Sequence, residues 1–184
     1  MRQILSRKIM QVTITERDVS ALNKFMLLHS KKAKKQKIVS TYAIAFEFLI
    51  FGIIIDGLFK TAPIASVASL IMGALWLVFF PKFYRKMLRK HIANAENIEP
   101  SSVVMNFLWS ESEISFANGE ARASEKFATS DLNRIARSGE NYFLGFERGF
   151  HIVLPCTEDT AREVENLAKF RHLAIESVDL NQKI

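Results

Sequence analysis

The sequence predicts a hairpin of two transmembrane helices joined to a small α+β domain, and three observations lead to this prediction. Two apolar runs occupy residues 38–59 and 62–80 of the 184-residue chain. Charge is sorted around them, because residues 1–37 carry a net +8, residues 82–91 a net +5 and residues 92–184 a net −6. From residue 103 onwards, short alternating segments are separated by turn signals, a pattern typical of antiparallel strands.

The N-terminal segment, residues 1–37, is predicted to form a short strand and an amphipathic basic helix on the cytoplasmic side. Residues 9–14 alternate weakly, Thr15 stands at an N-cap position, and Glu16 and Asp18 lie in the first turn. One helix face is apolar and consists of Val19, Leu22, Phe25, Met26 and His29. We expect this helix to run into the lysines and to pack on the C-terminal domain; the alternative is a helix that lies on the membrane or binds a partner.

The two apolar runs are each long enough to cross a bilayer, since roughly 20 helical residues span a hydrocarbon core of about 30 Å. The first run has Glu47 and Asp56 as its only charges, and the second has none. Lys60 and Thr61 alone separate them, so the helices form a tight antiparallel hairpin over residues 38–80. A cleaved signal peptide does not fit a run that begins at residue 38. Two buried helices of a soluble protein are the alternative.

Lysine and arginine flank the hairpin on one side and predict a multi-pass inner-membrane protein with both termini cytoplasmic. The same residues are candidates for contact with anionic lipid headgroups. The set comprises Lys31, Lys32, Lys34, Lys35, Lys37, Lys82, Arg85, Lys86, Arg89 and Lys90. Nucleic acid is not expected as a partner, because binding would take place against the bilayer and beside an acidic domain.

Glu47 is the principal polar candidate within the membrane, because a carboxylate at the centre of a span costs about 2.5–3.5 kcal/mol. We expect it at the depth of Gly73, either neutral or hydrogen-bonded across an oligomer or partner interface; a protonated or snorkelling acid without a role is the equal alternative. Asp56 lies near the outer interface, where hydration accounts for it. A ridge of small residues is expected to let the two helices approach closely. It consists of Ala65, Ser69 and Gly73 at four-residue spacing, and Gly52 on the first helix lies opposite Ser69.

After a juxtamembrane basic helix over residues 81–93, residues 94–174 are predicted to form a small cytoplasmic β domain. Strands are expected near residues 103–110, 113–118, 120–124, 132–137, 142–146 and 150–154, with a hairpin turn at Asn118-Gly119. Thr157 or Asp159 caps a closing helix that runs to about Leu173. Six antiparallel strands and a C-terminal helix describe a split barrel of pleckstrin-homology type, to which residues 9–14 could add a seventh strand. The tail, residues 175–184, is expected to be loose.

The chain resembles the YcxB-like bacterial membrane proteins over about residues 9–173. The entry segment VTITERDVSALNKFMLLHSKKAKKQK, the exit segment FFPKFYRKMLRKH and the late-strand segment SDLNRIARSGENYFLGFERGFHIVLP are similar to that family. The resemblance implies a membrane hairpin with a pleckstrin-homology-like cytoplasmic domain. It implies no catalytic residues.

We expect neither enzymatic activity nor a cofactor or metal. The four histidines are scattered, and Cys156 is a single cysteine with the pattern of a small packed residue. The expected function is therefore a non-catalytic membrane protein whose domain binds an unknown protein or a lipid headgroup. Two alternatives remain open: an oligomeric transport or channel assembly that uses Glu47, and an immunity or stress protein against a membrane-active toxin.

Overall fold

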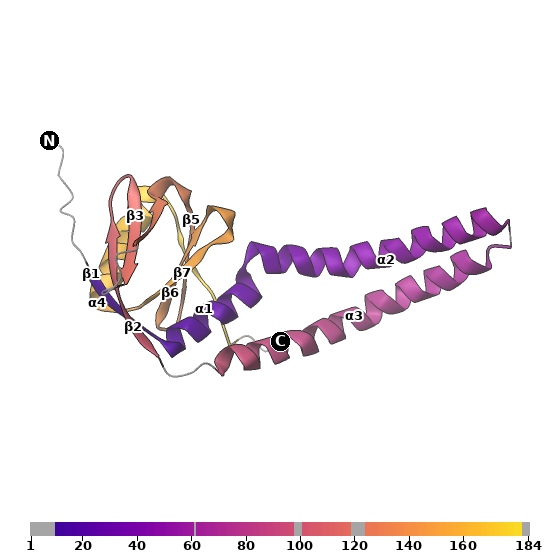
Figure 1. Cartoon of the computed structure of the whole chain (residues 1–184), viewed down its shortest axis with the longest axis horizontal. Coiled ribbons are helices and arrows are strands. Elements are labelled where there is room, and N and C mark those ends of the chain that lie inside the picture. Colours follow the sequence, from indigo (N-terminus) through magenta and orange to yellow (C-terminus); the bar gives the residue numbers. More distant parts are fainter. Residues whose placement is uncertain (1–9, 61, 98–100, 119–123, 182–184) are drawn as a thin grey trace. The chain divides into compact units, whose positions relative to one another are not determined.

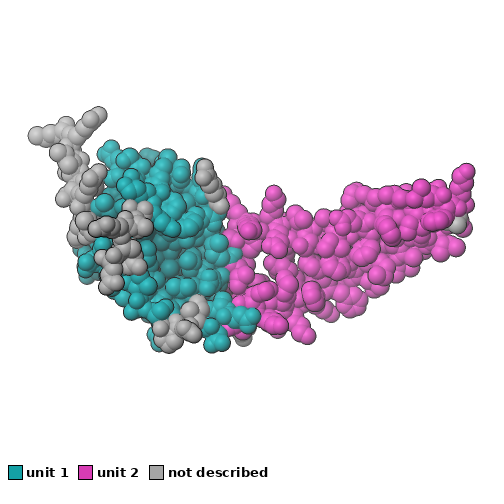
Figure 2. All heavy atoms as spheres, viewed as in Figure 1, with its two compact units in different colours: residues 1–26, 94–183 teal, residues 27–93, 184 magenta. Residues whose placement is uncertain are grey.

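The computed structural model describes residues 10–60, 62–97, 101–118 and 124–181. It divides into two compact units (Figure 2). The first, which we call the β unit, combines the chain up to Met26 with the chain from Asn94 onwards; the second, the hairpin unit, is residues 27–93. Residues from both flanks of the hairpin thus form one compact unit.

Two four-stranded sheets make up the β unit (Figure 1). Sheet A has the order β1-β2-β3-β4, all antiparallel, and is formed by Met10–Thr15, Ser102–Trp109, Glu113–Asn118 and Ser124–Ala128. Sheet B has the order β7-β6-β5-β8 and is formed by His151–Pro155, Asn141–Phe146, Leu132–Ser138 and Ile175–Ser177. A 3-10 turn, η1 (Thr129–Asp131), connects β4 to β5, and η2 (Glu147–Gly149) connects β6 to β7.

Strand β1 ties the N-terminal flank to the rest of the unit. Its six residues pair with β2 from Met10↔Phe107 to Thr15↔Ser102. The alternation seen in the sequence has a physical basis, since Met10, Val12 and Ile14 are buried while the residues between them face outward. The register is thus fixed by the apolar face.

Helix α1 (Glu16–His29) packs on sheet B. This agrees with the first of the two interpretations of its apolar face, namely a helix packed on the C-terminal domain. Phe25 is fully buried, and its ring stacks on that of Phe143 with centroids 4.4 Å apart. Ala21 and Leu22 also pack against the core, whereas Val19 is 36% exposed. All six residues of β6 are buried, because Tyr142, Leu144 and Phe146 belong to the core cluster and Phe143 is covered by α1.

Helix α4 (Glu158–Arg171) packs on the core that the two sheets share. Its N-cap is Thr157, whose hydroxyl accepts a hydrogen bond from the Thr160 amide at 3.2 Å. Val164 and Leu167 are fully buried in the core formed by both sheets. On the rim, Trp109 Nε1 donates to Glu163 at 2.9 Å, which joins sheet A to the helix.

The expectation of a loose tail is wrong for residues 175–181. His172 adopts the left-handed conformation (φ 52°) and ends α4, so that the chain turns back along β5. There Ile175–Ser177 forms β8, which pairs in parallel with Ile135–Arg137. The Arg134 guanidinium donates to the Glu176 carboxylate through both Nε (2.9 Å) and Nη2 (2.7 Å). Residues 182–184 lie outside the described part of the chain.

Two further expectations concern the loop between β3 and β4. The Asn118-Gly119 turn and nearly all of the strand expected at 120–124 fall on residues 119–123, which lie outside the described residues. The strand that the structure does describe there is β4, Ser124–Ala128, which pairs with β3 through Glu113↔Ala128 to Ala117↔Ser124.

The hairpin unit contains two helices, α2 (Lys31–Phe59) and α3 (Ile64–Glu96), both long and apolar enough to cross a membrane. Only 11% of each apolar window is buried, which does not fit two core helices of a soluble protein. The helix expected to run from α1 into the lysines is interrupted, because Ser30 caps a new helix by accepting from the Ala33 amide at 3.1 Å. Helix α3 continues through Pro81, so the second span and the basic helix are one element.

Candidate functional site

The turn end of the hairpin is held by Asp56, to which sequence reasoning gave no role beyond hydration. Its carboxylate oxygens accept hydrogen bonds from the backbone amides of Ala65 (3.1 Å) and Ser66 (2.7 Å). These amides belong to the first turn of α3, which leaves its N–H groups without intrahelical partners. Asp56 therefore caps the second helix from the first. The signal in the sequence is an acid placed just before a short turn and the helix start.

The small residues expected to form a ridge lie along the contact between α2 and α3. A Cβ atom built on Gly52 would lie 2.6 Å from Ser69 Oγ and 2.7 Å from the Ala65 carbonyl oxygen. One built on Gly73 would lie 3.3 Å from the Ala45 carbonyl oxygen. Glycine at these two positions thus allows the two backbones to approach.

Towards the basic end of the hairpin, aromatic rings replace the small residues. Trp76 stacks on Phe80 with centroids 4.8 Å apart, and Phe80 contacts Tyr84 at 5.8 Å. Trp76 Nε1 donates to the Ser40 carbonyl at 3.2 Å, and Lys37 Nζ lies 5.9 Å from the centre of the Tyr84 ring. The contact therefore changes from closely spaced backbones at the glycines to α3 rings that contact α2 at Ser40 and Lys37.

Glu47 does not face α3. Gly73, at the depth where the sequence placed Glu47, lies against Ala45 and Phe48 instead. Glu47 follows the buried Ala45 by two residues, about 200° around the helix, and its side chain is exposed. The structure thus separates Glu47 from the small residues of the hairpin contact.

All ten basic candidates are exposed on the two helices, namely Lys31, Lys32, Lys34, Lys35, Lys37, Lys82, Arg85, Lys86, Arg89 and Lys90. On α3 they recur at i, i+3, i+4, i+7 and i+8 from Lys82, which forms one stripe. Leu88 lies on the opposite face and is buried. This division suits a helix with one side on protein and the other side in an anionic headgroup layer.

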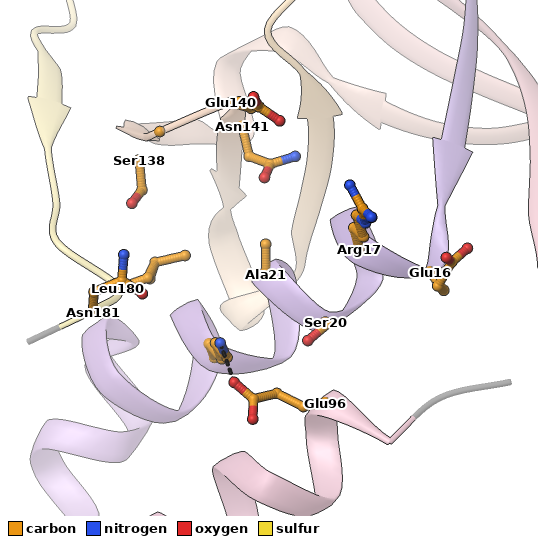
Figure 3. Close-up of a pocket in the computed structure, with 12 residues that line it drawn as sticks. Glu16, Arg17, Ser20, Ala21, Glu96, Ser138, Glu140, Asn141, Leu180 and Asn181 are labelled. Carbon is orange, nitrogen blue, oxygen red and sulfur yellow. Dashed lines mark ion pairs between the residues drawn. The ribbon is translucent and has the colours of Figure 1, made fainter. Parts of the chain in front are cut away.

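A cleft of about 410 Å³ lies within the β unit, between the first turns of α1 and the turn that joins β5 to β6 (Figure 3). Five of its twelve lining residues are charged, namely Glu16, Arg17, Glu140 and the ion pair of Lys24 with Glu96. Mixed signs of charge line this cleft and define no single class of ligand.

Beside this cleft, a buried polar contact joins the two flanks of the β unit. Asp18, 8% exposed, accepts from Asn141 Nδ2 at 2.5 Å and from the amide and hydroxyl of Thr15, each at 2.8 Å. Sequence reasoning placed Asp18 in the first turn of the helix but could not pair it with Asn141, which is 123 residues away.

Aromatic side chains reach the surface of the β unit at the η2 turn. Phe150 is 41% exposed and stacks on Phe127 at 4.8 Å, and Phe127 stacks on the buried Phe146 at 4.6 Å. We call these three residues the aromatic edge. It presents an apolar surface supported by the core.

Two titratable groups of the β unit have shifted pKa values. Burial lowers the pKa of His151, and the nearby Arg134 guanidinium adds to this, against the hydrogen-bonding contact between His151 Nδ1 and the Gly149 carbonyl (2.9 Å). Burial also raises the pKa of Tyr142, and a hydrogen bond with Cys156 acts in the same direction.

Among the described residues, no group of three or more histidine, cysteine, aspartate or glutamate side chains could hold a metal ion. Cys156 follows β7 and is half-buried against the core cluster. No family model matches the chain, and no curated protein or solved structure matches it.

Proposed function

We propose that this chain is a non-catalytic inner-membrane protein, similar to the YcxB-like family, that holds a pleckstrin-homology-like domain on the cytoplasmic side for binding another protein. The observation that carries the proposal is the composition of the β unit, which is built from both flanks of an apolar helical hairpin. Two antiparallel-dominated sheets closed by α4 support the pleckstrin-homology type.

The pairing of β1 with β2 supports a topology with both flanks on one side of the bilayer. These strands are separated by the whole hairpin, yet they share six paired positions. If the hairpin crosses the membrane twice, both strands emerge on the same side and can pair; with one crossing, they could not. The exposed lysines and arginines at the same end of α2 and α3 favour the cytoplasm as that side.

The chemistry of the β unit favours a protein over an anionic lipid as its ligand. The β unit, residues 1–26 and 94–183, carries a net −3, a sign that disfavours contact with phosphate headgroups. The aromatic edge offers the supported apolar surface that protein interfaces favour, since aromatic residues are enriched in them. Lipid headgroups would instead be contacted by the basic residues of the two helices.

Topology is tested with single cysteines in a Cys156→Ser background. A membrane-impermeant maleimide should label Lys60→Cys, in the turn, from outside the inner membrane. It should label Glu111→Cys, in the exposed turn between β2 and β3, only in inverted vesicles. The reverse pattern, or labelling of both residues from one side, would contradict the proposed arrangement.

Partner binding is tested by cross-linking in native membranes followed by mass spectrometry. The intact chain is compared with Phe150→Ser and with Phe170→Ser, which removes a ring of similar exposure (39%) from α4. We expect one protein to be captured by the intact chain and by Phe170→Ser and to be lost with Phe150→Ser. Recovery of the same proteins with all three chains would argue against the aromatic edge as the binding surface.

A further inference from the structure

The two acids of the apolar runs have opposite surroundings. Asp56 caps α3 and is therefore occupied within the hairpin. Glu47 is exposed, and among the described residues no hydrogen bond or ion pair is found for it. In a span of the proposed hairpin, this side chain would face hydrocarbon near mid-depth, where a carboxyl group is costly unless it meets protein or water.

We propose that the face of α2 that carries Glu47 binds a second copy of this chain, with the two Glu47 carboxyl groups hydrogen-bonded to each other. This inference rests on the membrane insertion in the proposed function. Copies inserted in the same orientation are related by a two-fold axis along the membrane normal, which brings each residue to the depth of its own counterpart. A second copy therefore supplies a carboxyl group at the required depth.

A carboxyl group is complementary to itself in this setting. When at least one of the two is protonated, its O–H donates to an oxygen of the other, so neither polar group is left without a partner in the hydrocarbon. A foreign partner would need a polar group placed at the same depth by chance. The symmetric pair needs nothing beyond this sequence.

The neighbours of Glu47 on α2 fit close helix packing. Ala43 precedes it by four residues on the same face, and small side chains there allow a second helix to approach. Ile50 and Ile54 follow on that face and are 41% and 50% exposed. These side chains can pack around the carboxyl pair and exclude lipid from it.

The test is disulfide cross-linking of the full-length chain in native membranes, in a Cys156→Ser background. Ile54→Cys lies on the Glu47 face, and Leu75→Cys is the control, because it is exposed on α3 about 200° from the contact residue Gly73. We expect oxidation to give a covalent dimer with Ile54→Cys and none with Leu75→Cys. Adding Glu47→Leu should lower the dimer yield roughly tenfold, whereas Glu47→Gln, whose amide both donates and accepts, should keep it within about threefold.

Three outcomes would overturn the proposal: no dimer with Ile54→Cys, equal dimer with Leu75→Cys, or a cross-link to a different protein. Carbonate extraction of the same membranes separates this failure from failure of the proposed function. If the chain stays in the extracted membranes, only self-association is lost. If the chain is released, it is not inserted in the membrane, and the proposed function is contradicted as well.

Discussion

Gly52 and Gly57 lie five residues apart on α2 and have different surroundings. A Cβ on Gly52 would come within 2.7 Å of both Ser69 and the Ala65 carbonyl, whereas a Cβ on Gly57 would meet nothing within 4 Å. The Ala65 oxygen belongs to the backbone and cannot rotate away. The effect of a glycine-to-alanine substitution on the stability of the hairpin should therefore depend on which side of α2 the residue occupies.

We predict that Gly52→Ala destabilises the hairpin by about 1–3 kcal/mol, the usual cost of overpacking. Gly57→Ala should be neutral or stabilising by up to about 1 kcal/mol, because alanine favours the helix. Unfolding of the full-length protein by titration with SDS in mild micelles measures both changes. Equal effects of the two substitutions would show that α2 and α3 do not meet at Gly52.

His151 is the residue at which pH should act on the β unit. Its pKa is lowered in the fold by burial, so the unfolded chain binds more protons below about pH 6.5. Stability should therefore fall as the pH drops from about 6.5 towards the lowered pKa of the folded protein. The Arg134 guanidinium, which donates a hydrogen bond to Glu176, contributes to this lowering of the His151 pKa.

We predict that His151→Gln flattens the pH dependence of stability between about pH 6.5 and 5. His91→Gln, at an exposed position on α3, is the control and should leave the dependence unchanged. Thermal unfolding of the β unit is monitored by pulse proteolysis of the full-length chain at each pH. The midpoint temperatures of the two variants and the parent are then compared. A His151→Gln profile that overlays the parent would rule out this histidine as the source.

At the scale of elements, α1 is a structural part of the β unit through one of its faces. Phe25 is fully buried against Phe143, and Asp18 is hydrogen-bonded to Asn141, so the first residue and the middle of β6 are both fixed to the helix. A helix that served only to bind lipid would need its apolar side chains exposed. Val19, which the sequence placed on this apolar face, lies at the margin of the face and is partly exposed.

We predict that Phe25→Ala lowers the free energy of unfolding of the β unit by about 3–5 kcal/mol, the range for loss of a buried phenylalanine. Val19→Ala should change it by no more than about 0.5 kcal/mol, because Val19 is 36% exposed. Denaturant unfolding followed by the fluorescence of Trp109, with Trp76→Phe in all chains, measures the difference. Comparable losses in both variants would place α1 elsewhere.

At the scale of the whole molecule, the hairpin interrupts a folded unit instead of preceding it. Residues 10–26 provide β1 and most of α1, and residues 94–181 provide the remaining strands and α4. The interruption makes the β unit dependent on two segments that are far apart in the chain, which slows their pairing because a long loop must close first.

We predict that replacing residues 27–93 by a flexible glycine-serine linker of about 15 residues gives a soluble, folded β unit. Residues 94–184 alone should not fold, because β2 then has an unpaired edge and β6 loses its cover. Dispersion of amide resonances in two-dimensional NMR spectra distinguishes the two chains. A folded spectrum from residues 94–184 alone would contradict the requirement for both flanks.

The sequence predicts those features that depend on local patterns. Two apolar runs of sufficient length define the helices, alternation defines the strand near residues 9–14, and the cap at Thr157 marks α4. Strand β8 could not be predicted from local patterns, because the three residues Ile175–Ser177 are too few to show an alternation of apolar and polar side chains. Its formation depends on the turn at His172 and on the edge of β5, neither of which is a property of the tail itself.

Length, hydropathy and period are local quantities, and they are enough to predict the two long apolar helices, the sorted charges beside them and the α+β character of the C-terminal half. The tertiary structure adds the register of β1 on β2, the stacking of Phe25 on Phe143 and the cap that Asp56 provides for α3. It also places Glu47 on the side of α2 away from the neighbouring helix. These outcomes depend on pairings between distant residues and on helix rotation, which are determined by the packing of the whole fold.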